Sequence, residues 1–276
     1  MKKHLSTLLL FIVFFIGLSL LLYPTFSDWW NSFHQSRAIV DYDSAMADLD
    51  PEDYSAYFQA AEEYNRQVAQ LNYPLMYYDQ VEGYEEALNL TGNGIMGYIQ
   101  IPKIDVSLPI YHGTSEGVLQ VAVGHLEGSS LPTGGEGTHC ALSAHRGLPS
   151  ARLFTDLDLM EVGDTFTLTV LDRLLTYQVD QILIVEPQDV EALYVVEGED
   201  LCTLITCTPY GINSHRILVR GHRIENAPEE RVFRVTAEAI QIDPIIVAPM
   251  VAAPMLLILL IVLLFPHPGK KRRKEG

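Results

Sequence analysis

One cysteine of this chain, Cys207, lies in a sequence context that suits a reactive thiol. Cys207 follows a β-branched run, Thr203-Leu204-Ile205-Thr206, that favours an extended backbone. The next residues, Thr208-Pro209-Tyr210-Gly211, have the composition of a turn, because proline cannot continue a central strand and glycine permits a sharp bend. The sequence therefore predicts that Cys207 ends a strand, where its thiol leaves the sheet and can meet a substrate.

A thiol in such a position suits nucleophilic acyl transfer if an imidazole and a guanidinium reach it. Arg216 lies nine residues after Cys207, and His145 lies well upstream. The thiolate is the reactive form of cysteine, and its ordinary pKa of about 8.5 makes a nearby cation or proton acceptor important. Histidine can protonate a leaving amine near neutral pH, and a guanidinium supplies charged donors to an oxyanion. These three residues are therefore the candidate acyl-transfer site.

Two further cysteines, Cys140 and Cys202, each lie five residues before one of these candidates. Free cysteine is commonly a small buried hydrophobe, and we expect both thiols to be buried and inert. A disulfide between them would need their strands to be neighbours, and we do not expect one. With three cysteines in total, at least one thiol stays unpaired.

Alternatives exist for the base and for the cation. His125 is the alternative base, although we expect four turn-adjacent histidines to be structural: His112, His125, His139 and His215. Arg220 and Arg223 are alternatives to Arg216, and Arg220 follows it by four residues, so both point to the same face of a strand. The sequence has no Cys-x-x-Cys and no common zinc-ligand spacing, so we expect no metal and no cofactor.

From residue 95 onward, the pattern becomes that of short strands. Eight runs of apolar and β-branched residues alternate with turn residues: 97–101, 106–110, 140–144, 165–170, 175–179, 182–185, 201–206 and 217–220. Residues 171–174 predict a hairpin connection, and residues 154–160 predict one short helix. This spacing favours a closed or nearly closed β-barrel over a βαβ sheet. The predicted fold is mainly β, an eight-stranded barrel over residues 95–224 with helices before it.

The region before the barrel, residues 24–94, predicts helices and a break. Asp50-Pro51-Glu52-Asp53 combines an N-cap, proline at the first helical position and acidic residues in the first turn. Apolar residues then repeat at helical spacing and predict one packing face: Tyr54, Tyr57, Phe58, Ala61, Tyr64, Val68 and Leu71. Another helix is expected over residues 37–49.

Two uncharged apolar runs, residues 5–23 and 245–265, are each about long enough to cross a bilayer as a helix. Basic residues flank both on their outer ends, in residues 1–4 and 266–276. The positive-inside rule then predicts a two-pass protein of the cell membrane with cytoplasmic termini, an external middle and a linker over residues 225–244. A cleaved signal peptide is the alternative for the first run, but no Ala-x-Ala-like site follows it.

The segment between the apolar runs is strongly acidic. It holds 11 basic and 34 acidic residues, a formal charge of −23. Such a surface argues against nucleic acid or an anionic membrane face as a ligand, and it suits a basic partner such as a lysine-bearing protein.

Several motifs of the predicted barrel resemble those of sortases. Residues 203–207 match the Thr-Leu-x-Thr-Cys signature of that family. Other stretches fit in the family's order: Gly94-Ile95-Met96-Gly97-Tyr98-Ile99, Ile101-Pro102-Lys103-Ile104, Leu108-Pro109-Ile110-Tyr111-His112-Gly113-Thr114, Gly124-His125-Leu126-Glu127-Gly128, Ala144-His145-Arg146-Gly147, Cys207-Thr208-Pro209-Tyr210-Gly211 and His215-Arg216. The two anchors and the N-terminal helices make the chain most similar to class C, pilus-assembling sortases.

The resemblance implies a cysteine transpeptidase in which Cys207 is the nucleophile, His145 the general acid and base, and Arg216 the oxyanion-stabilising group. Thr203 and Thr206 are implied to contact the substrate or the oxyanion. The implied substrate is a surface or pilin protein with a Leu-Pro-x-Thr-Gly-like sorting signal, cleaved between Thr and Gly through a thioester. The implied acceptor is an amine, from a pilin lysine or from the peptide cross-bridge of the cell wall.

One departure from the resemblance concerns the lid over the active site. Class C sortases typically anchor this lid with Asp-Pro followed by an aromatic residue. Here the only Asp-Pro before the barrel is Asp50-Pro51, and Glu52 follows it. The expected place of a lid, residues 73–80, has Tyr77-Tyr78-Asp79 instead. We expect a shortened or differently built lid, with Tyr77 or Tyr78 as the residue that occupies the site.

Two rival functions share these residues. A hydrolytic cysteine protease would perform the same first half-reaction and release a free acid even when amine is abundant. A non-enzymatic pilus-assembly scaffold would bury Cys207 without using it, would form no acyl-enzyme and would lose nothing when Cys207 is replaced by alanine.

Overall fold

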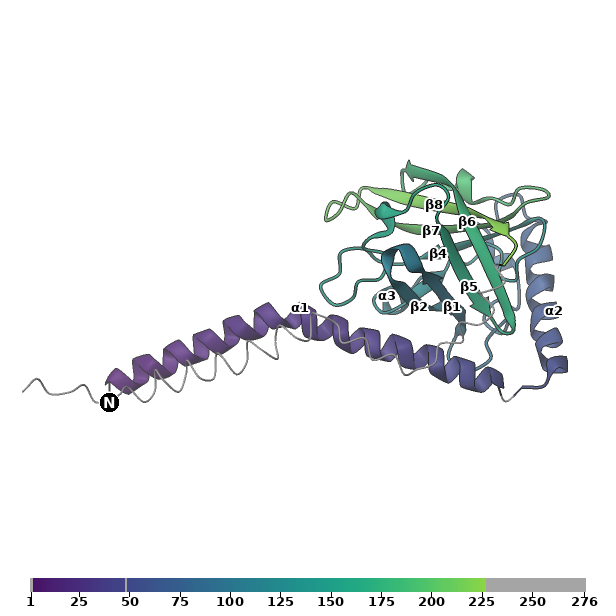
Figure 1. Ribbon diagram of the computed structural model, residues 1–276. Coiled ribbons are helices and arrows are strands. Elements are labelled where there is room, and N and C mark those ends of the chain that lie inside the picture. The colour runs from purple at the N-terminus through teal and green to yellow at the C-terminus, as the bar shows by residue number, and fades with distance from the viewer. Residues whose placement is uncertain (1, 48, 227–276) are drawn as a thin grey trace, which may run out of the picture. The chain divides into compact units, whose positions relative to one another are not determined.

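The described part of the chain consists of helices followed by a β-barrel (Figure 1). The computed structural model describes residues 2–47 and 49–226. The helices are α1 Lys2–Ala47, α2 Pro51–Val68 and the short α3 Glu116–Leu119, with 3-10 turns at Tyr78–Gln80, Pro102–Ile104, Leu157–Leu159 and Glu191–Leu193. The strands are β1 Ile95–Ile101, β2 Val106–His112, β3 Val123–His125, β4 Thr138–Ser143, β5 Thr165–Val170, β6 Arg173–Val185, β7 Asp200–Thr208 and β8 His215–Ile224.

The strands close into a barrel in the order β1-β2-β3-β4-β7-β8-β6-β5. Two of the neighbouring pairs, β2 with β3 and β4 with β7, are parallel, and the others are antiparallel. The connection between β4 and β7 contains β5 and β6, because parallel neighbours need a long crossover. The parallel pairing brings the carboxyl ends of β4 and β7 to the same end of the barrel.

The predicted barrel is confirmed, with two differences in its strands. The predicted strands 175–179 and 182–185 are one strand, β6, which bends at an irregularity between Val179 and Gln181. The strand β3 was not predicted, because three residues that include Gly124 show no period of two. The predicted helix over residues 154–160 is only the 3-10 turn Leu157–Leu159.

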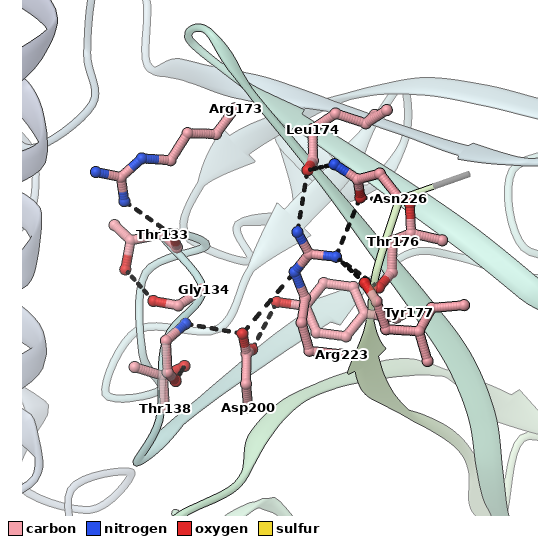
Figure 2. Close-up of polar contacts among 12 residues, drawn as sticks. Thr133, Gly134, Thr138, Arg173, Leu174, Thr176, Tyr177, Asp200, Arg223 and Asn226 are labelled. Atoms are coloured by element: carbon pink, nitrogen blue, oxygen red, sulfur yellow. Dashed lines mark hydrogen bonds and ion pairs between the residues drawn. The ribbon is translucent and has the colours of Figure 1, made fainter. Parts of the chain in front are cut away.

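One end of the barrel is closed by a polar network (Figure 2). Asp200 accepts hydrogen bonds from the Tyr177 hydroxyl at 2.9 Å and from the Gly135 backbone N–H at 2.8 Å. The Arg223 guanidinium lies 4.0 Å from the same carboxylate. Because β7 begins at Asp200 and ends just after Cys207, this network marks the end of the barrel opposite the candidate nucleophile.

Helix α1 is one continuous helix, whereas the sequence predicted a membrane segment and a separate helix over residues 37–49. Pro24 lies inside it, and the loss of one backbone hydrogen bond is tolerated in so long a helix. Within the described residues, one helix, Phe11–Ala47, is long and apolar enough to cross a membrane, which is compatible with an N-terminal anchor. The second predicted membrane segment, 245–265, and the tail after it lie outside the described residues.

The carboxyl-terminal half of α1 packs against the barrel. Tyr42 is fully buried, donates to the carbonyl oxygen of Met96 at 3.1 Å and accepts from the Leu171 N–H at 2.8 Å. Nearer the apolar part of the helix, the Asn31 amide donates to the carbonyl oxygen of Ser150 at 2.8 Å. These contacts fix α1 to β1, to the β5–β6 turn and to the loop that follows β4.

Helix α2 begins at Pro51, as predicted, and runs alongside the barrel with its apolar face inward (Figure 1). Tyr64 accepts a hydrogen bond from the Gly128 N–H at 3.1 Å. The buried Asn65 amide binds both polar groups of the Leu131 backbone, accepting from its N–H at 2.7 Å and donating to its carbonyl oxygen at 3.2 Å. The helix therefore holds the β3–β4 loop in place.

Candidate active site

Cys207 and Arg216 are direct partners across β7 and β8. Side chains alternate along a strand, so Leu204 and Thr206 point into the barrel while Ile205 and Cys207 lie on its outer face. Cys207 is partly exposed and is a free thiol. The pairing places Cys207 and Arg216 side by side on the outer face of the barrel, and their roles as nucleophile and cation stay predictions.

The end of β4 brings His145 toward the same place. The Ala144 N–H donates to the carbonyl oxygen of Ile205 at 3.2 Å, and the Thr206 hydroxyl donates to the carbonyl oxygen of Ala144 at 2.7 Å. These bonds continue the β4–β7 register by one residue beyond its last pair, Ser143 with Ile205. The next residues in that register are His145 and Cys207, so the parallel strands bring the candidate base and the candidate nucleophile together.

The Arg216 guanidinium is oriented by the loop before it. One of its nitrogens, Nη1, donates to the carbonyl oxygens of Asn213 at 3.2 Å and His215 at 3.1 Å. Asn213 itself has a positive φ of 59°, and asparagine is one of the few residues besides glycine that tolerate this left-handed conformation. The loop carbonyls thus bind one nitrogen of the guanidinium, and the strand pairing places Arg216 next to Cys207.

The two alternative arginines have other partners. Arg220 forms a bidentate ion pair with Asp180, with N–O distances of 3.0 and 2.7 Å. Arg223 belongs to the Asp200 network at the opposite end of the barrel. Both placements favour Arg216 as the group that meets an oxyanion formed at Cys207.

A cluster of apolar side chains, called the apolar floor below, lies next to Cys207 on the outer face of the sheet. Ile205 pairs with Leu218, two residues before Cys207 and on the same face of the sheet as the Cys207–Arg216 pair. These two side chains form one buried cluster with Ala141 of β4 and Leu193 of the β6–β7 connection. More apolar side chains pack around the cluster: Leu75, Leu126, Leu183, Val185, Val190 and Ala192. The candidate nucleophile therefore lies at the end of an apolar surface that the β6–β7 connection borders.

Comparisons with known proteins agree with this architecture. A model of the sortase domain matches residues 99–224. Sortase D of Bacillus subtilis is 30% identical over 131 residues, which make up 46% of this chain and 63% of that protein. Sortase A of Streptococcus agalactiae is 31% identical over 117 residues, 41% of this chain and 47% of that protein. The chain thus spans between about half and two thirds of the length of these relatives.

The solved structures it resembles are sortases C. Sortase C1 of Streptococcus agalactiae is 50% identical, with a TM-score of 0.63 over 69% of this chain and 100% of that one. Sortase C of Streptococcus pneumoniae is 45% identical, with a TM-score of 0.61 over 70% and 99% of the two chains. This chain belongs to the sortase family. Its structural neighbours are class C members of that family, as the motifs predicted.

A segment of this sortase, residues 73–80, covers part of the apolar floor. Its contact to the floor is Leu75, whereas Tyr77 and Tyr78 were the predicted contacts. Pro74 is buried, and its carbonyl oxygen would lie 2.5 Å from a Cβ at Gly128, so only glycine allows this approach. The next residue, Leu75, packs on the Ile205–Leu218 cluster. Tyr77 and Tyr78 are 43% and 42% exposed. Occupation of the site by one of these tyrosines stays a prediction, and Leu75 contacts the floor.

Thr203 and Thr206 have partners within the sheet. The Thr206 hydroxyl binds Ala144, as described, and the Thr203 hydroxyl lies 2.7 Å from Nε2 of His139. Nδ1 of His139 donates to the carbonyl oxygen of Tyr194 at 2.9 Å, so Nε2 of the neutral ring accepts from Thr203. Both threonines are buried. A direct contact with substrate stays a prediction, and the structure gives each hydroxyl a positioning contact.

His139 links strand β7 to the β6–β7 connection through its hydrogen bonds with Thr203 and Tyr194. Burial lowers the pKa of His139 below its usual range; the positive charge of Arg220 acts in the same direction, and the bond to Tyr194 opposes both. The imidazole is therefore neutral near pH 7. Sequence reasoning treated His139 as structural and could not identify its partners, because Tyr194 is distant in the chain.

Glu116 was not predicted from the sequence. One of its oxygens lies 3.5 Å from Nε2 of His145, and the other accepts from the Gln120 amide at 3.0 Å. The Gln120 hydrogen bond and then the charge of His145 lower the pKa of the Glu116 carboxyl. Helix α3 thus presents a carboxylate to the candidate base. A lone acidic residue in a predicted loop gives no signal of such a role.

The alternative base His125 is a structural residue. It is fully buried, and its Nε2 donates to the carbonyl oxygen of Ser130 at 2.9 Å. Its Nδ1 lies 2.9 Å from the hydroxyl of Tyr84, which is also buried. Both ring nitrogens therefore have partners inside the protein. Among the residues that the structure describes, no group of three or more His, Cys, Asp or Glu side chains could hold a metal ion.

Proposed function

We propose that this sortase is a membrane-anchored cysteine transpeptidase. It cleaves a Leu-Pro-x-Thr-Gly-like sorting signal between Thr and Gly and passes the acyl group to an amine. The observation that carries the proposal is the in-register, parallel pairing of β4 with β7, which continues to His145 and Cys207. Arg216 is the cross-strand partner of that cysteine, at the end of an apolar floor.

The first half-reaction forms a thioester. His145 takes the proton of the Cys207 thiol, and the thiolate sulfur attacks the carbonyl carbon of the signal's threonine. Arg216 donates to the negative oxygen of the tetrahedral intermediate. The C–N bond then breaks, His145 returns its proton to the departing glycine amine, and the acyl group stays on sulfur.

The second half-reaction reverses the roles of the same groups. An acceptor amine attacks the thioester carbon, and Arg216 again stabilises the oxyanion. His145 accepts the proton of the attacking amine, and the Cys207 thiolate leaves. The products are a new amide bond and the free enzyme.

The apolar floor supports a signal with a large aliphatic residue before the cleaved bond. When the threonine carbonyl lies at Cys207, the residues before it extend over Ile205 and Leu218. Burial of a leucine side chain there contributes about 1.5–3 kcal/mol of favourable free energy to the binding of the signal. The β6–β7 connection, which carries Leu193, forms one wall of this binding site.

A pilin lysine is the acceptor that we favour. The sortase C of Streptococcus pneumoniae, 45% identical to this chain, has a specificity for pilin substrates. The formal charge of −23 between the apolar runs also favours a lysine-bearing partner. The alternative acceptor is the amine of a cell-wall cross-bridge.

We assign the lid to residues 73–80, with Leu75 as its contact to the floor. Because Leu75 lies on the cluster that the signal's leucine would cover, signal and lid compete for one apolar surface. The lid therefore has to move before a signal binds.

The decisive experiment is mass spectrometry of the sortase incubated with a sorting-signal peptide, with and without a lysine-bearing pilin peptide. We expect a thioester on Cys207 in the first mixture and an amide-linked product in the second. Release of free acid alone, with abundant lysine present, would show a hydrolase. An unmodified Cys207 in every mixture would leave the scaffold function as the explanation.

A further inference from the structure

The two buried cysteines are neighbours across the parallel pair of β4 and β7. Cys140 and Cys202 are direct Cα partners, and partners in register on parallel strands point to the same face of a sheet. Here that face is the barrel interior, where the side chains are 2% and 0% exposed. Both are free thiols in the structure.

We propose that Cys140 and Cys202 form a disulfide that joins β4 to β7 inside the folded barrel. Neighbouring strands lie about 4.8 Å apart, which is within the range of about 4.4–6.8 Å that Cα atoms span across a disulfide. Side chains on the concave inner face of a barrel also converge. From the sequence we expected two inert thiols. The observed strand order changes this expectation, because it makes the strands of the two cysteines direct neighbours.

The geometry selects one pairing among the three cysteines. Cys207 lies on the outer face of β7, and Cys202 lies on the inner face of the same strand. Cys140 shares the inner face with Cys202 alone. The disulfide therefore leaves Cys207 as the free thiol, and it removes the two sulfurs that could otherwise pair with the nucleophile during folding.

The bond forms by thiol–disulfide exchange with a small or protein-bound disulfide as oxidant. The thiolate of one of the two cysteines attacks one sulfur of the oxidant and releases a thiol, and the thiolate of the other cysteine then displaces the second. Two protein thiols become one disulfide, while the oxidant's disulfide is reduced to two thiols. Because both sulfurs are buried in the closed barrel, the exchange takes place while β4 and β7 are still assembling.

The disulfide would fix the register that the active site needs. His145 follows Cys140 by five residues and Cys207 follows Cys202 by five, on parallel strands. A covalent bond between the two earlier positions therefore also fixes the later two opposite each other. This role concerns the fold, so it stands independently of the proposed acyl transfer.

Peptide mapping tests the bond directly. The full-length chain is refolded in detergent with oxidised and reduced glutathione, alkylated in denaturant without reduction, and digested. We expect Cys140 and Cys202 in one cross-linked peptide pair and Cys207 alkylated. Alkylation of all three cysteines, or a cross-link that includes Cys207, would overturn the proposal.

Thermal unfolding supplies a second measurement. Reduction of the refolded wild type should lower Tm by roughly 10 °C, because the disulfide closes a long loop. The Cys140→Ala/Cys202→Ala variant should show no reductant-dependent change, and the Cys207→Ala variant should behave as the wild type does. A wild-type Tm that is equal with and without reductant would contradict the bond, whether or not the protein transfers acyl groups.

Discussion

At the scale of single residues, partners distinguish three arginines that the sequence left as alternatives. Arg216 pairs with Cys207 across the strands, Arg220 is bound to Asp180, and Arg223 lies at the other end of the barrel. Arg216 is also held by loop carbonyls through one nitrogen. A planar fork oriented in this way cannot be replaced by a single ammonium group.

Arg216→Lys should therefore slow acylation of Cys207 by about 10²–10³-fold, which is the usual loss when one oxyanion donor is removed. Single-turnover kinetics with a labelled sorting-signal peptide measure this rate. The matched control is Arg220→Lys, which weakens the ion pair with Asp180 but leaves the oxyanion site intact. Equal rate losses in the two variants would disprove the assignment of Arg216.

His139 gives a prediction about stability against pH. Its pKa is lowered in the folded state, while the unfolded chain has the ordinary value of about 6.5. Below about pH 6.5 the unfolded state therefore binds more protons, and stability falls as the pH decreases. His139→Gln keeps a donor for Tyr194 and removes this proton uptake. We expect a shallower decrease of Tm between about pH 7 and pH 5 than in the wild type; an unchanged slope would refute the role of His139.

At the scale of elements, β4 and β7 position the candidate site, and we proposed residues 73–80 as its lid. Pro74 fits against the backbone at Gly128, and Leu75 reaches the apolar cluster beside the nucleophile. The segment thus makes an aliphatic contact, whereas class C sortases typically use Asp-Pro followed by an aromatic residue.

Leu75→Ala should accelerate labelling of Cys207 by a thiol reagent. Losing about 1 kcal/mol of apolar contact should raise the population of the open lid roughly five-fold. Tyr77→Ala and Tyr78→Ala are matched controls, because both side chains are exposed, and they should leave the rate unchanged. Deletion of residues 73–80 should have the largest effect. Equal rates in Leu75→Ala and the wild type would argue against the lid.

The elements that local patterns specify were predictable, and those that depend on distant partners were not. Strand β5 was predicted over its observed residues because Thr165–Val170 alternates regularly. Strand β3 consists of three residues that are extended only because β2 and β4 pair with them. For the candidate site, motifs predicted Cys207, His145 and Arg216, and their roles stay predictions. Leu75 and Glu116 were missed, because their contacts depend on how distant segments pack.

At the scale of the whole molecule, an apolar helix precedes the acidic barrel. Phe11–Ala47 is long and apolar enough to span a bilayer, and its exposed aromatic residues Phe26, Trp29, Trp30 and Phe33 follow the most apolar part. Aromatic side chains favour the interface between lipid and water. With Lys2 and Lys3 at the other end, this order favours a barrel on the external side of the membrane.

An orientation experiment checks this placement. In intact cells, a membrane-impermeant maleimide should label Cys207 in the Leu75→Ala variant, whose lid contact is weakened. The Cys207→Ala/Leu75→Ala variant should stay unlabelled, because Cys140 and Cys202 are buried. Labelling that requires permeabilised cells would place the barrel on the cytoplasmic side.

The parallel β4–β7 pair also has a consequence for timing. Its two strands are separated in the chain by β5 and β6, and β8, which carries Arg216, comes later still. Contacts between such distant segments form late in folding, because the intervening loop must close first. Cys207, His145 and Arg216 therefore come together only after nearly all of the barrel has been synthesised. If the proposed function holds, a partly synthesised chain has no assembled site and cannot acylate itself or a neighbouring substrate prematurely.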